Sequence, residues 1–186
     1  MFNTTIVSVI ISETFMRFQR ARNQLPQQIF APVIHFPSVF LSPDSVCKGT
    51  EGHRHAMRNA WSLASTMNFT CIFEDDILRN KLPLPDIRKY KYDLIFLGNL
   101  ETLNNRYKSN DYYTNHAQCM TRKGAQQLLS LTRDCLTKKG RGVDELIRNA
   151  CKSKHIKCID TIHAYTQDRL HVKSYLHDSK NNYIGT

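Results

Sequence analysis

The chain has 186 residues, of which 41% are hydrophobic and 23% are charged. This length and composition predict one globular domain over residues 1–186 and exclude a disordered chain. Its 26 Lys and Arg outnumber its 16 Asp and Glu, for a formal net charge of +10, so the surface attracts anions such as phosphorylated molecules, nucleic acid or an anionic surface on which the protein associates peripherally.

The six cysteines have a context that favours free thiols. No basic region precedes the apolar run at residues 6–11, and that run is too short for a signal peptide or a membrane span. Cys71 and Cys119 lie inside apolar, strand-like runs, as small core residues do. We therefore expect reduced cysteines and a cytoplasmic protein.

The predicted elements alternate between strands and helices. Apolar and β-branched runs predict strands at residues 5–12, 28–35, 70–73, 92–97, 116–120, 156–159 and 162–165. Helical spacing predicts helices at residues 15–25, 49–67, 123–131 and 143–154, the third capped by Thr121. Residues 37–47, 99–113 and 140–142 are expected to be loops or turns. This order predicts the α/β class with a mostly parallel central sheet.

Three adjacent carboxylates, Glu74, Asp75 and Asp76, directly follow one of the predicted strands. Ligands of α/β sheets bind beyond the carboxyl ends of the strands. Adjacent carboxylates repel one another unless a cation compensates them, and Mg²⁺ or Mn²⁺ typically uses one or two carboxylates together with phosphate oxygens. The spacing leaves two readings open, which are a metal site and a solvated acidic turn beside Arg79 or Lys81.

Several motifs then follow in a fixed order. The segment CIFEDDI at residues 71–77 precedes YDLIFLG at residues 92–98, and His116-Ala117 leads on to GAQQLL at residues 124–129 and to Val143-Asp144. This series resembles the family 25 glycosyltransferases, the lipooligosaccharide and procollagen galactosyltransferase type. The resemblance implies a GT-A fold, which is a nucleotide-binding α/β/α sandwich, and transfer of a sugar from a UDP-hexose to a glycan or other hydroxyl acceptor.

The resemblance also implies roles for the acidic residues. Asp76 would bind Mn²⁺ or Mg²⁺, Asp75 would contact the donor or the metal, and Glu74 would support them. The family is expected to invert the anomeric carbon, which requires a general base. Asp144 is the first candidate for that base and Glu145 the second, although an acid in the first turn of a helix also stabilises the helix dipole.

Two further residues have open assignments. Thr121 lies at a helix start, where backbone N–H groups can hold a donor phosphate, or it simply caps an exposed helix. His116 lines the acceptor site or satisfies a local hydrogen bond.

The chain departs from the family pattern on the helix before the acidic triplet. The family has Gly-Cys-x-x-Ser-His, where this chain has Gly52 and His53 followed by Ala56 and Met57. The Ser-His pair is therefore missing. The Asn-Leu-x-Arg that follows the family's first strand reads Ile-Ile-Ser-Glu at residues 10–13, so the contacts to the donor nucleoside are expected to differ.

Two other functions stay open. A metal-dependent phosphoryl-transfer enzyme or nuclease would use the same acidic triplet and hold nucleic acid on its basic surface. Against it, the sequence shows no second set of carboxylates for a two-metal site and no compact segment of interleaved aromatic and basic residues, so nucleic acid is not the expected partner. The other alternative is a non-catalytic nucleotide-sugar-binding module, which the missing Ser-His pair suggests.

Overall fold

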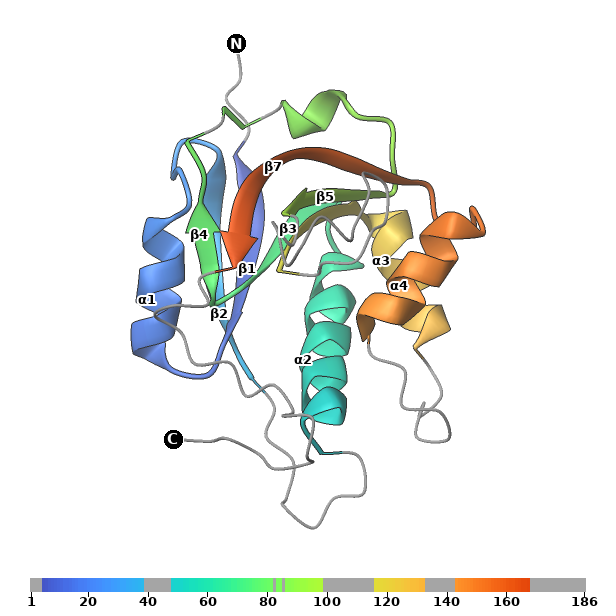
Figure 1. Ribbon diagram of the computed structural model, residues 1–186, viewed down its shortest axis with the longest axis horizontal. Coiled ribbons are helices and arrows are strands. Elements are labelled where there is room, and N and C mark those ends of the chain that lie inside the picture. Colours follow the sequence, from blue (N-terminus) through green and yellow to red (C-terminus); the bar gives the residue numbers. More distant parts are fainter. Residues whose placement is uncertain are drawn as a thin grey trace, which may run out of the picture.

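The computed structural model describes residues 5–38, 48–81, 83, 84, 86–98, 116–132 and 143–167, except for the side chains of residues 48–51, 162, 163 and 167. Seven strands form one sheet in the order β2-β1-β3-β6-β5-β7-β4 (Figure 1). The strands are β1 Ile6–Ser12, β2 Phe30–Pro37, β3 Phe69–Glu74, β4 Ile77–Arg79, β5 Leu94–Gly98, β6 Ala117–Thr121 and β7 Cys158–Gln167.

The sheet is mixed, whereas we expected it to be mostly parallel. The pairs β1–β2, β1–β3 and β5–β7 are parallel, and the pairs β3–β6, β5–β6 and β4–β7 are antiparallel. A parallel neighbour requires a crossover connection, usually a helix. No helix is predicted between the strands at residues 92–97 and 116–120, and β6 accordingly lies antiparallel to β5.

Helices cover both faces of the sheet, as the predicted α/β class requires. The helices are α1 Phe15–Asn23, α2 Lys48–Ala64, α3 Arg122–Leu131 and α4 Val143–Lys152. The helix α1 buries Phe18 and Ala21 against one face. On the other face α2, α3 and α4 share a core in which Trp61 is fully buried. Figure 1 shows α1 on one side of the strands and the other three helices on the opposite side.

Helix starts follow the expected capping chemistry. The hydroxyl of Thr121 accepts a hydrogen bond from the Gly124 N–H at 3.1 Å, which confirms the predicted N-cap. Gly124 also allows α3 to start close to β5, because a Cβ at this position would lie 2.1 Å from the Asp93 carbonyl oxygen.

Other boundaries differ from the prediction. The two short strands expected at residues 156–159 and 162–165 form one strand, β7. The strand β4 and the 3₁₀ helix Ile87–Lys89 were not predicted, because three residues are too few to show a period. The loop at residues 99–113 and the turn at residues 140–142 lie outside the described residues, as do residues 39–47 of the expected loop.

The expectation of reduced cysteines is wrong for four of them. Disulfides join Cys71 to Cys119 and Cys151 to Cys158. Cys71 and Cys119 are buried core residues as predicted, but β3 and β6 pair in a register that sets them opposite each other. Since disulfides persist mainly in oxidising compartments, this argument for a cytoplasmic protein no longer holds. Among the described residues, no helix is long and apolar enough to cross a membrane.

Candidate active site

The acidic triplet lies where the connections of the sheet change direction. From β1 the chain passes through α1 on one face to β2, whereas α2 on the other face leads into β3. Because β1 and β3 are parallel neighbours, their carboxyl ends form the edge at which α/β proteins of this kind bind ligands. Residues 12–13 and 74–75 meet at this edge, and Asp75-Asp76 is the turn between β3 and β4.

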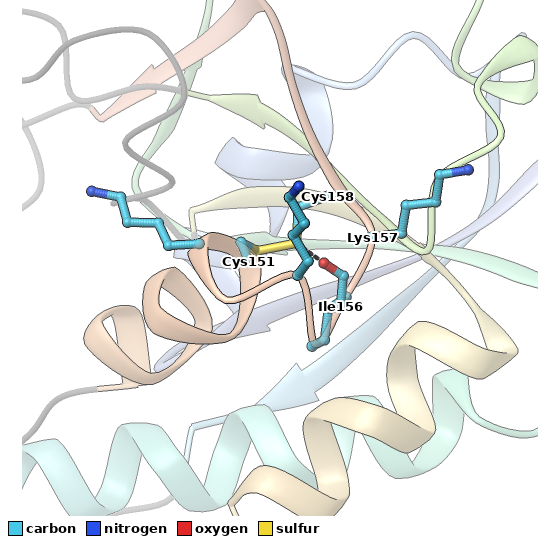
Figure 2. A pocket seen from close by; sticks show the side chains of 6 residues that line it. Cys151, Ile156, Lys157 and Cys158 are labelled. Atoms are coloured by element: carbon cyan, nitrogen blue, oxygen red, sulfur yellow. Dashed lines mark hydrogen bonds between the residues drawn. A yellow bond between two sulfur atoms is a disulfide. The ribbon is translucent and has the colours of Figure 1, made fainter.

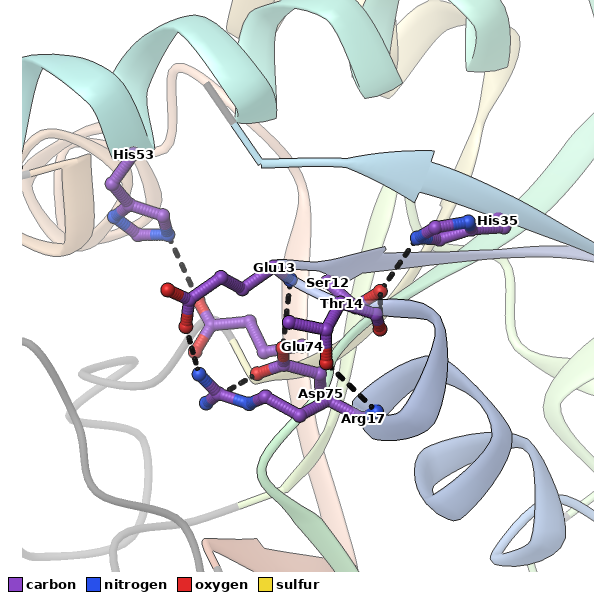
Figure 3. Close-up of polar contacts among 8 residues, drawn as sticks. All are labelled: Ser12, Glu13, Thr14, Arg17, His35, His53, Glu74 and Asp75. Carbon is purple, nitrogen blue, oxygen red and sulfur yellow. Dashed lines mark hydrogen bonds and ion pairs between the residues drawn. The ribbon is translucent and has the colours of Figure 1, made fainter. Parts of the chain in front are cut away.

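Asp75 ties these two strand ends together through both of its carboxylate oxygens. One oxygen accepts a hydrogen bond from the backbone N–H of Glu13 at 3.0 Å, and the other accepts one from the Arg17 guanidinium at 2.9 Å (Figure 3). Arg17 also pairs with the Glu13 carboxylate. Since Arg17 is in the first turn of α1, whose N-cap is Thr14, the start of this helix is fixed to the acidic turn.

The surroundings of Asp75 and Asp76 disfavour the ionised form of both carboxyls. Burial raises the pKa of Asp75. Arg17 and the hydrogen bond from the Glu13 N–H lower it, but by less, so the pKa stays above its usual value. Burial, together with the charges of Glu74 and Asp75, raises the pKa of Asp76 to about 7, against the lowering effect of Arg17. Each of the two residues is only 9% exposed. A bound cation at the turn would relieve this repulsion.

Glu74 is compensated from the opposite face of the sheet. The Nε2 atom of His53, on α2, lies 2.9 Å from a carboxylate oxygen of Glu74 (Figure 3). Burial lowers the pKa of His53, but the hydrogen bond to Glu74 and the charge of Glu74 outweigh it. The charges of Asp144 and Asp76 add to this effect, and the pKa of His53 rises to about 9.

The pKa of Glu74 shifts in the other direction. Burial raises the pKa of Glu74, but the hydrogen bond from His53 and the positive charge of His53 lower it by more. The charge of His116 adds to this lowering. Glu74 and His53 therefore form an ion pair at neutral pH.

His116 and Asp144 lie close to this pair, as their effects on its pKa values show. His116 is buried, its backbone carbonyl accepts a hydrogen bond from the Glu74 N–H at 2.9 Å, and its imidazole ring packs against Gly98. A Cβ at Gly98 would lie 2.2 Å from the His116 ring, so a glycine is required there. Asp144 and Glu145 are both half-buried residues of the first turn of α4.

Thr121 does not lie with the other predicted site residues. It pairs with Phe69, the first residue of β3, whereas Glu74 is the last. Five strand residues at about 3.3 Å each put the two ends roughly 17 Å apart. Thr121 caps α3 at the edge of the sheet opposite the acidic turn.

The structure also brings two basic residues, Arg17 and His53, to the acidic triplet. Arg17 could have been placed from the sequence, because the first turn of a helix that directly follows a strand starts at the strand's carboxyl end. His53 could also have been found, because it precedes Met57 and Trp61 at spacings of four residues. Both of those are fully buried, so His53 lies on the helix face that packs against the sheet.

The carboxylate oxygens of the turn are of the kind that hard divalent cations prefer. Among the described residues, no three His, Cys, Asp or Glu side chains are grouped as a metal site. Asp76 and Asp75 offer carboxylate oxygens, and burial raises the pKa of both groups, so a bound cation would favour their ionised form. Mg²⁺ and Mn²⁺ accept such sparse protein ligation, with phosphate oxygens and water supplying the rest.

Solved glycosyltransferases share this fold at low sequence identity. A glycosyltransferase involved in the glycosylation of the major capsid of PBCV-1 has a TM-score of 0.51 and 8% identity, covering 91% of this chain and 94% of that chain. The catalytic domain of Drosophila β1,4-galactosyltransferase 7 in complex with xylobiose has a TM-score of 0.54 and 11% identity, covering 91% and 74%. A mutant of that enzyme with manganese, UDP-Gal and xylobiose reaches a TM-score of 0.47, too low to support an inference.

These likenesses confirm the GT-A-like α/β fold. No family model matches the sequence, and no curated protein matches it. The resemblance to family 25 therefore rests on the quoted motifs alone.

Proposed function

We propose that the chain is a metal-dependent glycosyltransferase that moves a hexose from a nucleotide sugar, preferably a UDP-hexose, to a hydroxyl of a glycan or another acceptor. One observation carries the proposal. A buried pair of adjacent carboxyls, one of which has its pKa raised to about 7 by burial and by its acidic neighbours, lies at the carboxyl ends of the parallel strands of a sheet whose fold is shared with solved glycosyltransferases. The motif series that resembles family 25 supports a distant relation to that family.

In this proposal Asp76 is the main protein ligand of Mn²⁺ or Mg²⁺. Its raised pKa marks it as the carboxylate that the protein alone compensates least. Asp75 is the second candidate ligand, since each of its oxygens accepts one protein hydrogen bond and keeps a further lone pair. The bound ion would stabilise the negative charge of the departing nucleoside diphosphate.

Asp144 is the proposed general base, with Glu145 as the second choice. Transfer with inversion needs a carboxylate that takes the proton from the acceptor hydroxyl while its oxygen attacks the anomeric carbon and the bond to the diphosphate breaks. The charge of Asp144 acts on His53, the partner of Glu74, so Asp144 lies near the acidic turn. His116 also lies close to Glu74, whose pKa it lowers, and is the proposed wall of the acceptor site.

The test is calorimetric titration of UDP-glucose, UDP-galactose and other nucleotide sugars, first with Mn²⁺ and then with EDTA. We expect binding that requires the metal and that is lost in Asp76→Ala. The matched control is Asp86→Ala, which removes an exposed carboxylate outside the site. Metal-independent binding, or unchanged metal-dependent affinity in Asp76→Ala, would contradict the metal assignment. Absence of all nucleotide-sugar binding, together with salt-dependent binding of DNA or RNA, would favour the nuclease instead.

Binding alone does not separate an enzyme from a non-catalytic module. Donor hydrolysis or transfer therefore has to be measured under the same conditions, by release of UDP. Metal-dependent release supports the transferase. Tight donor binding without any release, in the presence of diverse hydroxyl acceptors, would identify a binding module on this fold.

A further inference from the structure

A second charged region lies on the loop that connects α4 to β7, at the end of the sheet where the acidic turn does not lie. The disulfide between Cys151 and Cys158 closes this loop. Its six intervening residues are KSKHIK, with three lysines and no acid. The side chains of Lys152, Lys154 and Lys157 are all exposed.

The loop surrounds a hollow. Its volume is about 370 Å³, and it is lined by Cys151, Lys152, Lys154, Ile156, Lys157 and Cys158. Figure 2 shows the disulfide in the middle of this lining, with Lys157 to one side. A concave site with several lysines presents compact positive charges, which suit the oxygens of a phosphate group.

The backbone of the loop is held in place from several sides. Besides the disulfide, the Gln127 side-chain amide donates a hydrogen bond to the His155 carbonyl at 2.9 Å, and the His155 N–H donates one to the Ala150 carbonyl at 2.9 Å. Lys154 has a φ of 59°, in the left-handed region. Glycine or asparagine is the usual residue at such a position after a helix. Here a lysine occupies this strained position. Residues other than glycine with a positive φ are concentrated at functional sites.

Neighbouring residues extend the positive charge along this edge. The Asp93 N–H donates to the Lys157 carbonyl, and the Thr121 N–H donates to the Asp93 carbonyl, so β5, β7 and the start of α3 meet here. Among the described residues of this edge, six exposed cations accompany one acid, Asp93. The six cations are Lys91, Arg122, Lys123, Lys152, Lys154 and Lys157.

We propose that the Cys151–Cys158 loop is a binding site for a phosphate-bearing ligand, with several phosphate groups or one phosphate on a larger molecule. This site is separate from the acidic turn and does not depend on transferase activity. The loop lysines would attract one phosphate group to the hollow, and the flanking cations would attract the remaining negative charge.

The test uses inorganic tripolyphosphate as the probe, measured by calorimetry in EDTA at low and at physiological salt. In the triple variant Lys152→Gln, Lys154→Gln, Lys157→Gln, each lost lysine should weaken binding roughly fivefold, or about 100-fold together at low salt. A matched control removes three exposed cations from α1, β4 and the segment after β4. The control substitutions are Arg22→Gln, Arg79→Gln and Lys81→Gln. It should bind tripolyphosphate within about threefold of the unmodified protein.

A second variant tests whether the site is built or only charged. Replacing Cys151 and Cys158 by Ser keeps every lysine but opens the loop, and should weaken binding at least threefold because the ligand must then order the loop. Thermal melts of all variants check that they are folded. Equal losses in the loop variant and the control would overturn the proposal. So would unchanged affinity in the Ser variant, or no binding to the unmodified protein at low salt.

Vesicle sedimentation then separates two sources of the phosphate. Phosphatidylcholine vesicles with and without phosphatidic acid are the probes. Sedimentation that needs phosphatidic acid and the three loop lysines would assign the ligand to a lipid headgroup. Tripolyphosphate binding without sedimentation would assign it to a soluble phosphate ester. Sedimentation that is unaffected in the loop variant would count against the site.

Discussion

Replacing Asp76 with Asn should make the metal-free protein more stable at neutral and alkaline pH. Burial and the charges of Glu74 and Asp75 raise the pKa of Asp76 from 3.8 to about 7. A carboxyl with a raised pKa binds more protons in the folded state, so the free energy of unfolding falls as the pH rises between these two values. A difference of about three pH units, at roughly 1.4 kcal/mol each, sets an upper limit of about 4 kcal/mol on the gain.

Urea unfolding in EDTA measures this gain. We expect Asp76→Asn to be more stable than the unmodified protein by about 2 to 4 kcal/mol at pH 8. The difference should shrink as the pH falls and approach zero below about pH 3, where the carboxyl is protonated in both the folded and the unfolded state. Asp86→Asn is the control. Its hydrogen bond with Arg88 lowers the pKa of this exposed carboxyl, so its replacement should give no stabilisation. Equal stability of Asp76→Asn and the unmodified protein at pH 8, or an equal gain at pH 4, would refute the reasoning.

Four further outcomes follow from the same geometry. His53→Gln should lower the melting temperature most at pH 6, and the melting temperatures of variant and unmodified protein should converge near pH 10. The reason is that the ion pair with Glu74 stabilises the fold fully below pH 6.5 and is lost as the pH rises through about 9. A loss of melting temperature that does not depend on pH would contradict this prediction. Arg17→Met should cost roughly 2 kcal/mol in urea unfolding at pH 8, less than a fully buried pair, because both partners keep some exposure; the loss should shrink at low pH, when Asp75 is protonated. Asp144→Asn should slow sugar transfer by about 10² to 10⁴ with donor affinity nearly unchanged in calorimetry, and near-normal turnover would remove it as the base. Alkylation of denatured, unreduced protein, read by mass spectrometry, should leave four cysteines unlabelled; labelling of any of them would count against its disulfide. They are Cys71, Cys119, Cys151 and Cys158.

The position of the acidic turn could be predicted because its signal is local. An apolar strand that runs into three acids shows both the element and its end within seven residues, and β3 ends at Glu74, one residue beyond the predicted end. The compensation of these acids could not be predicted in the same way. Arg17 and His53 reach the turn from helices on opposite faces of the sheet, and which face a helix covers depends on the order of the strands.

The disulfide between Cys71 and Cys119 escaped prediction for a related reason. Each cysteine reads as a small apolar residue within its own strand. Their contact requires that β6 lie next to β3 and that the register align these two residues. Local periodicity contains neither piece of information, because 48 residues separate them along the chain. The strand β4 is a similar case, since its three residues are defined by pairing with the distant β7.

The six exposed cations around the Cys151–Cys158 loop do not compensate the carboxylates of the acidic turn. The two lie at opposite ends of the same strands, and the five residue steps from Phe69 to Glu74 in β3, at about 3.3 Å each, separate them by roughly 17 Å. Exposed charges at physiological salt are screened over about 8 Å. Among the described residues Arg17 is the cation that lowers the pKa of Asp76, and after its contribution this pKa is still about 7. A strongly basic chain thus retains a local need for a cation, and a bound metal ion would meet it.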